Sequence, residues 1–186
     1  MLADTQEFKA RWSPAVWIIT AAVLGLIVGV EVLLVRLAYA TSGDKVTQTL
    51  LIVAMLLPVG IFGIVALLAP WSYTVRSDAI VVNRLGPAVV LRFEQIRETQ
   101  RIDSAEIGFA WRTFGSGGFL GWFGWFYSPE IGAFLAYATN RRDLVLVTRN
   151  DATKVVISPY PPDAFLLAAQ SNERRPTATP TTDNVS

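Results

Sequence analysis

The 186-residue chain contains no cysteine and no histidine. Without cysteine there are no disulfides and no thiol nucleophiles, and without histidine there are no Ser–His–Asp triads and few transition-metal sites. Charged residues make up only 17% of the chain and the formal net charge is +1, which gives no electrostatic basis for binding nucleic acid. We therefore expect no enzyme, no metal, no cofactor and no nucleic-acid partner.

Hydrophobic residues are plentiful, at 52% of the chain, and they concentrate near the N-terminus. Two apolar runs are each longer than the ~20 helical residues that cross a ~30 Å hydrocarbon core. They predict transmembrane helices over 14–35 and 48–70, joined by an external loop over 36–47 and preceded by a cytoplasmic N-terminus over 1–13. Pro58 lies inside the second run and predicts a kink.

The residues that flank the two runs predict how the hairpin lies in the membrane. Aromatic residues of the kind that anchor helices at the membrane interface occur at their ends: Trp12, Trp17, Trp71 and Tyr73. Basic residues are more frequent beside the N-terminus and after the second run than in the connecting loop: Lys9, Arg11, Arg76 and Arg84 against Arg36 and Lys45. The positive-inside rule then places both termini in the cytoplasm.

Two features of the first run leave alternatives open. Ala38, Tyr39 and Ala40 resemble an A-x-A cleavage site, although the apolar stretch is longer than a typical signal peptide and Glu31 and Arg36 interrupt it. A charge at the bilayer centre costs ~2.5–3.5 kcal/mol on insertion scales and usually marks a function or a partner. A glutamate close to the far interface instead extends to water at little cost, and we favour this interpretation for Glu31.

From Trp71 onward the pattern changes from helical to extended. Short β-rich runs alternate with turn residues, which predicts about seven antiparallel strands in a small barrel or sandwich over 71–170. The stretch that ends at Gln170 predicts a closing helix, with Asp163 as its cap and Phe165 on its apolar stripe. No apolar periodicity follows in 171–186, which predicts a disordered tail.

One stretch, FGSGGFLGWFGWFY at 114–127, combines glycine with aromatic rings and carries no charge. Its glycines allow tight bending and are predicted to shape a loop: Gly115, Gly117, Gly118, Gly121 and Gly124. Its rings are the predicted contact surface for a protein partner or a membrane: Phe119, Trp122, Phe123, Trp125, Phe126 and Tyr127. In the alternative interpretation, part of this set folds back onto the barrel: Phe119, Trp122, Phe123 and Phe126.

The strand layout, the segment GSGGFLGWFGWF, the motif at 137–140 (YATN) and the motif at 156–159 (VISP) resemble the bacterial pleckstrin-homology-like (PH-like) domain family. The resemblance covers about residues 71–170 and implies a PH-like barrel closed by a C-terminal helix. It also implies a bacterial cytoplasmic membrane, because such domains are often attached to N-terminal membrane helices. The basic cluster of phosphoinositide-binding members is missing, since Arg76 in the first hairpin faces Asp78.

The expected function is therefore binding rather than catalysis. We expect a membrane-anchored PH-like scaffolding module that presents the glycine–aromatic loop to a protein partner, or to a second copy, at the cytoplasmic face. The alternative is peripheral engagement of the bilayer by the aromatic loop without phosphoinositide specificity. No catalytic or metal-binding residue is predicted.

Overall fold

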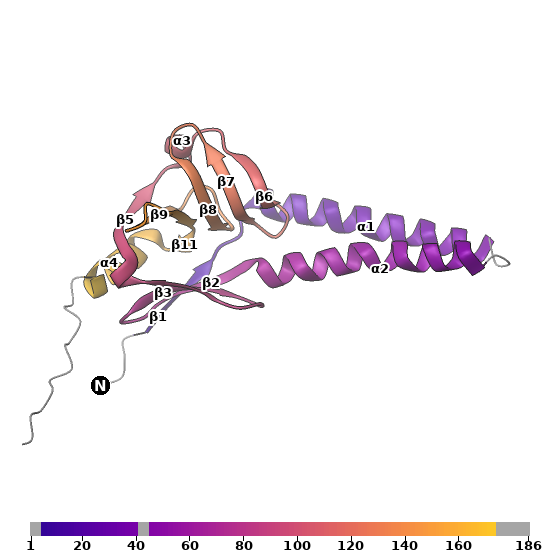
Figure 1. Ribbon diagram of the computed structural model, residues 1–186, viewed down its shortest axis with the longest axis horizontal. Coiled ribbons are helices and arrows are strands. Elements are labelled where there is room, and N and C mark those ends of the chain that lie inside the picture. The colour runs from indigo at the N-terminus through magenta and orange to yellow at the C-terminus, as the bar shows by residue number, and fades with distance from the viewer. Residues whose placement is uncertain (1–4, 41–44, 174–186) are drawn as a thin grey trace, which may run out of the picture.

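The computed structural model of the protein describes residues 5–40 and 45–173, which form two long helices and a β-rich domain with a C-terminal helix (Figure 1). The first sheet has the order β11-β1-β2-β3-β4, with bounds Pro159–Tyr160, Gln6–Ala10, Pro70–Val75, Ala79–Arg84 and Val89–Arg92. The second sheet has the order β5-β9-β10-β8-β7-β6, with bounds Ile96–Ile102, Leu144–Arg149, Lys154–Ile157, Gly132–Ala138, Trp122–Ser128 and Trp111–Gly117. The helices are α1 (Pro14–Ala40), α2 (Lys45–Leu68), α3 (Ser104–Ile107) and α4 (Pro162–Glu173), with a 3₁₀ turn η1 at Phe93–Gln95.

The helices α1 and α2 are both long and apolar enough to cross a membrane. Almost all of their side chains point away from the rest of the protein, and such an all-round apolar surface is stable in lipid rather than in water. Both helices are longer than predicted: residues 36–40 and 45–47 of the expected loop are helical, and 41–44 lie outside the described residues. The helix α2 continues through Pro58.

The N-terminal segment contributes a strand that the sequence did not predict. Strand β1 lies between β11 and β2, with Lys9 opposite Ser72. Phe8 is buried in the core, and its ring packs edge-on against Phe165 of α4 with ring centroids 5.2 Å apart. The two long helices are therefore an insertion between two neighbouring strands of one sheet, which holds both ends of the helical hairpin together.

The prediction of a barrel with about seven antiparallel strands is wrong in its detail. The described residues form eleven strands in two sheets that do not close into a barrel. One pair is parallel: the hairpin of β9 and β10 brings β10 beside β8, with Lys154 opposite Phe134. The closing helix is confirmed and ends at Glu173, three residues beyond the predicted limit. The predicted tail from residue 174 onward lies outside the described residues.

The central strands of the second sheet, β9 and β10, are buried on both faces. In β9, Val145 and Val147 point into the core between the sheets, whereas Leu144 and Leu146 belong to a second apolar cluster on the outer face. Such a strand is a continuous apolar run rather than an alternating one. The short helix α3 lies over this second cluster through Ile107, so the outer face of the sheet has a cover of its own.

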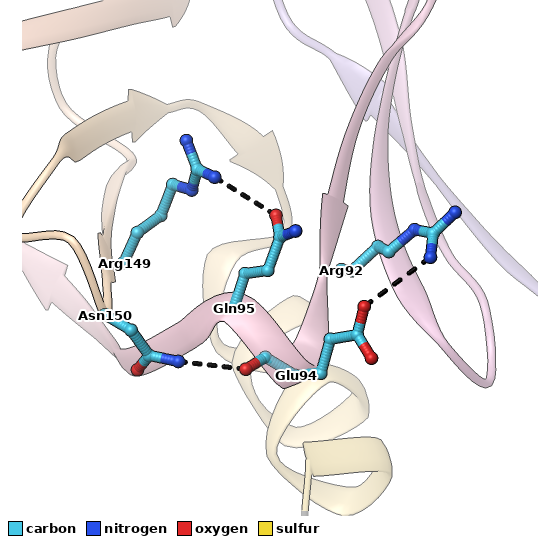
Figure 2. Close-up of polar contacts among 5 residues, drawn as sticks. All are labelled: Arg92, Glu94, Gln95, Arg149 and Asn150. Atoms are coloured by element: carbon cyan, nitrogen blue, oxygen red, sulfur yellow. Dashed lines mark hydrogen bonds and ion pairs between the residues drawn. The ribbon is translucent and has the colours of Figure 1, made fainter.

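Hydrogen bonds connect η1, the segment that links the two sheets, to the end of β9 and the turn that follows it. Figure 2 shows Arg149 donating to Gln95 Oε1 at 3.1 Å, and Asn150 Nδ2 donating to the Glu94 carbonyl at 2.9 Å. Arg92 forms an exposed ion pair with Glu94 at 3.5 Å. These bonds hold η1, which links the two sheets, against the far end of the second sheet.

Candidate functional site

The glycine–aromatic stretch forms the antiparallel hairpin of β6 and β7, and its register divides the side chains between two faces. Residues directly opposite each other in a sheet share a face. Trp111 lies opposite Tyr127, and Phe114 lies opposite Trp125, on one face. The other face carries the pairs Arg112 with Phe126 and Gly117 with Trp122. One strand pair thus presents rings on one side and a mixed surface on the other.

Two glycines let the strands approach each other in the middle of this hairpin. Gly115 and Gly124 lie opposite each other with φ of +118° and +112°, where a side chain is strained. A Cβ on either glycine would also collide with a carbonyl of the facing strand, that of Phe123 or that of Phe114. These two glycines therefore let β6 and β7 approach each other closely, and they lie within the paired strands.

The tip of the hairpin packs on the two membrane-length helices. The Leu120 amide donates to Thr20 Oγ1 of α1 at 3.0 Å, and this hydrogen bond is buried. The ring of Phe119 lies against Phe62 of α2, with centroids 5.7 Å apart. Gly118 approaches Ile19 so closely that a Cβ would lie 2.7 Å from its Cδ1. The sequence offered folding onto the barrel as one alternative, but it did not predict docking onto the helices.

The predicted ring residues differ in where they lie. Phe123 and Phe126 are buried, at 3% and 6% exposure, and contribute to the two apolar clusters. Trp122 is half-buried, as is Phe119. Only Trp125 and Tyr127 are well exposed, at 45% and 46%. The predicted contact surface thus consists of two accessible rings and four that are wholly or partly packed.

Three more exposed rings were missed by the sequence analysis: Phe109, Trp111 and Phe114, of which Phe114 is 75% exposed. Phe109 and Trp111 precede the glycine–aromatic stretch 114–127, and Phe114 is its first residue. The cross-strand register places Trp111 and Phe114 on the same face as Tyr127 and Trp125. We call Phe109, Trp111, Phe114, Trp125 and Tyr127 the aromatic face. Phe109 packs edge-on against Trp111 at 5.3 Å, and Trp111 stacks on Tyr127 at 6.4 Å. The aromatic face is therefore a group of exposed rings on one side of the hairpin.

A second group of rings gathers where the helices join the domain. Trp12 lies 4.9 Å from Trp17 and 6.1 Å from Trp71, measured between ring centroids. Three of the four predicted interfacial anchors therefore form one cluster. Tyr73, the fourth, is fully buried in the core, so that part of the prediction is wrong. Trp71 and Tyr73 would share a face in a regular strand, but the pairing of β2 with β3 is irregular between Pro70 and Ser72, so the alternation is broken at Trp71.

A buried polar network ties the segment before α1 to the core of the domain. The Tyr73 hydroxyl donates to the Tyr137 carbonyl at 2.6 Å and lies 3.3 Å from Ser158 Oγ. Ser158 Oγ accepts the Thr139 amide at 2.8 Å, and the Thr139 hydroxyl donates to the Arg11 carbonyl at 3.0 Å. Burial raises the pKa of Tyr73 from 10.0 to about 12, so its hydroxyl remains a donor. The two short motifs that carry the family resemblance supply this network.

Within 5–40 and 45–173, no group of three or more acidic side chains is arranged to hold a metal ion. Asp103 and Glu106 are occupied in the capping box of α3, where Asp103 accepts the Ala105 amide and Glu106 accepts the Asp103 amide, each at 2.8 Å.

The fold and the attached helices define a class: a β domain of two sheets, closed by a C-terminal helix and joined to a pair of membrane-length helices. A family model described as "Bacterial PH domain" matches residues 71–172, which is more than half of the chain. The chain belongs to the bacterial PH domain family. Comparison with curated proteins and with solved structures gives no significant match. Strand β1 lies outside the matched region although it completes the first sheet.

Proposed function

We propose that this protein is a membrane-anchored binding and scaffolding module whose aromatic face rests in the interfacial layer of the bilayer. One observation carries the proposal: the tip of the β6–β7 hairpin is packed on both membrane-length helices through Leu120 and Phe119, while the rings beside the tip are exposed. In Figure 1, β6 is the strand of its sheet drawn nearest to α1. Docking the tip on the helices keeps the adjoining aromatic face close to the membrane.

The chemistry of the aromatic face suits the interfacial layer. Tryptophan and tyrosine are enriched at the headgroup level, where their rings are shielded and their polar atoms remain hydrated. The face carries no charged side chain, because Arg112 belongs to the opposite face of the hairpin. This absence of charge favours contact with acyl chains and headgroup carbonyls over contact with phosphate groups.

The topology of the proposal follows from the pairing of β1 with β2. If α1 and α2 both span the bilayer, the N-terminal strand and the domain lie on the same side of it. The basic residues Lys9, Arg11, Arg76 and Arg84 support the cytoplasm as that side, by the positive-inside rule. We propose accordingly a two-span protein of the bacterial cytoplasmic membrane with both termini cytoplasmic, acting without catalysis of its own.

Because the chain has no cysteine, single cysteines can test the placement of the aromatic face. Phe114→Cys is labelled with an environment-sensitive fluorophore in the full-length protein, reconstituted in vesicles. Leu167→Cys on α4, exposed to 68% and outside the hairpin, is the matched control. We expect blue-shifted emission and quenching by a lipid-attached nitroxide for the label at Phe114, and neither for the label at Leu167. Emission typical of water at both positions would refute the placement.

A second candidate function is binding of a protein partner, or a second copy, by the same rings. It is favoured by the exposed pair Trp111 and Tyr127, which is stacked and therefore pre-organised as binding hot spots often are. The intact mass of the full-length protein, released from its native membrane in mild detergent, distinguishes the two. A stoichiometric complex that Trp111→Ser dissociates, without unfolding the domain, would support a protein contact. A monomer with a lipid-exposed Phe114 label would favour the bilayer.

A further inference from the structure

The face of the hairpin opposite the aromatic face lines a pocket of about 430 Å³. Its floor is the outer face of the second sheet, with Phe126, Phe134, Leu144 and Val156, and its cover is α3 through Ile107. Pockets that hold small ligands have volumes of roughly 300–1,000 Å³ and mostly apolar walls. The size suits a small ligand or one chain of a larger one, and the lining combines an apolar floor with the polar side chains of Ser104, Arg112 and Arg141.

Small residues create the space between the sheet and its cover. Gly115, Gly124 and Ala136 are consecutive partners across β6, β7 and β8, and they form one row on the pocket side of the sheet. In the next row towards the hairpin tip, Gly117 and Ala138 flank Trp122. Gly117, Ala136 and Ala138 line the pocket, so larger side chains at these three positions would take up part of its volume.

Two arginines stand at the mouth of this apolar pocket. Arg112 comes from β6, and its Nη1 lies over Gly117, 3.6 Å from the position that a Cβ there would occupy. Arg141 comes from the loop after β8, and its guanidinium lies over the Trp122 ring at 5.7 Å. Among the described residues neither side chain has an ion pair or a hydrogen bond, and no carboxylate lines the pocket.

The acidic residues nearest in sequence are already engaged. Asp143, two residues after Arg141, accepts a hydrogen bond from Asn140 Nδ2 at 2.9 Å. The carboxylates of α3, next to the pocket cover, serve its capping box. Two unpaired guanidiniums beside an apolar cavity are complementary to a ligand that carries an anionic head on an apolar chain, since guanidinium groups bind phosphate through paired hydrogen bonds.

The position of the mouth favours the bilayer as the source of that ligand. Gly117 and Trp122 line the pocket and directly flank the turn whose residues pack on α1 and α2. Basic pockets beside membrane helices are suited to anionic lipid headgroups. We propose that the pocket holds one acyl chain of an anionic phospholipid, with the phosphate at Arg112 and Arg141. This inference rests on the proposed position of the domain at the bilayer surface and adds a ligand to it.

Native mass spectrometry of the full-length protein in mild detergent tests the proposal, with phosphatidylglycerol, phosphatidylcholine and dodecanoate added in turn. We expect one retained phosphatidylglycerol per chain and at least tenfold weaker retention in Arg112→Gln/Arg141→Gln, because a hydrogen bond to a charged group contributes about 1.5–3 kcal/mol. The matched control Arg76→Gln/Arg97→Gln removes the same charge from two other exposed arginines. Ala136→Phe, which fills the pocket, is expected to abolish retention.

Each outcome decides for or against the lipid. Equal retention by the arginine variant and its control, or equal retention of phosphatidylcholine and phosphatidylglycerol, would overturn the proposal. Retention of dodecanoate but not of phosphatidylglycerol would overturn the proposal and indicate a free fatty acid as the ligand. A co-purified polypeptide that the wild-type protein retains and the arginine variant loses would overturn it and indicate a peptide ligand. The arginine variant alters exposed side chains only, so it decides the matter even if Ala136→Phe does not fold. A lipid-exposed Phe114 label with an empty pocket would refute this inference and leave the proposed function standing.

Discussion

The single hydrogen bond between the hairpin tip and α1 can be removed with little change of shape by Thr20→Val. Thr20 is 5% exposed, and its Oγ1 accepts the amide of Leu120, a residue with the left-handed φ of +57°. Valine keeps the branched shape but offers no acceptor. We expect the tip to detach from the helices more often, and the aromatic face to lose its fixed position at the membrane.

The size of the effect follows from the burial of the bond. A buried donor left without its partner costs about 1–3 kcal/mol. A free energy of that size corresponds to a change of roughly 5- to 150-fold in the equilibrium between the docked and the detached tip. The contact of Phe119 with Phe62 remains, so the tip opens more often without being released permanently.

Hydrogen exchange of the full-length protein in nanodiscs measures this opening directly. We expect faster exchange in the peptide that contains Leu120, by a factor within that range, and unchanged exchange in the peptide that contains β9. Thr20→Ser keeps the acceptor and should exchange as the wild type does. Thr49→Val is the matched control, because the Thr49 hydroxyl donates only to the Lys45 carbonyl within α2. Equal exchange at Leu120 in the Thr20 and Thr49 valine variants would refute the reasoning.

Three further substitutions test other parts of the structure. Gly124→Ala is expected to destabilise the domain. Backbone strain at a positive φ costs about 1–3 kcal/mol, and the collision of the new Cβ with the facing strand adds to that cost. Tyr73→Phe should reduce the loss of stability at high pH. Burial favours the neutral hydroxyl, so the stability that Tyr73 contributes is fully present below pH 10.0 and is lost as the pH rises through about 12. Glu31 Oε1 is buried without a hydrogen-bond partner among the described residues, contrary to the water-exposed side chain expected from the sequence. Glu31→Leu should therefore raise the melting temperature in lipid.

Thermal and chemical unfolding, followed by circular dichroism, checks all three. Gly132→Ala is the control for Gly124, because Gly132 also has a positive φ but has open space where a Cβ would lie. If the two variants are equally stable, the collision is unimportant. A Tyr73→Phe variant with an unchanged alkaline transition would show that another group governs it. A lower melting temperature for Glu31→Leu would indicate that Glu31 has a partner outside the described residues.

The sequence alone was sufficient for the features that depend on local composition. Two long apolar runs predict membrane-length helices, because each is long and apolar enough to cross a hydrocarbon core. The closing helix was equally accessible, since Phe165 and Ala169 lie on one helical stripe and both are fully buried. The glycines at 115 and 124 were predicted to shape a loop; they lie opposite each other within the β6–β7 hairpin and have positive φ angles.

Pairing between distant segments was beyond the reach of local patterns. Nothing in the sequence near Phe8 indicates a partner more than sixty residues away, and yet β1 pairs with β2. The same holds for the parallel contact of β10 with β8, which departs from the expected set of antiparallel strands. The rings of Trp111 and Phe114 join those of Tyr127 and Trp125 only through the register of the hairpin.

The sequence by itself determined that this protein has two membrane-length helices followed by a bacterial PH domain, because helix length, apolar composition and family motifs are local properties of the chain. Only the tertiary structure decided which rings are exposed, where the hairpin tip docks and that Arg112 and Arg141 stand unpaired over an apolar pocket. The physical reason is that exposure and pairing depend on which segments meet in space. An aromatic residue is found both in cores and on surfaces, so its type alone does not tell whether it is buried. Its neighbours across the sheet determine that.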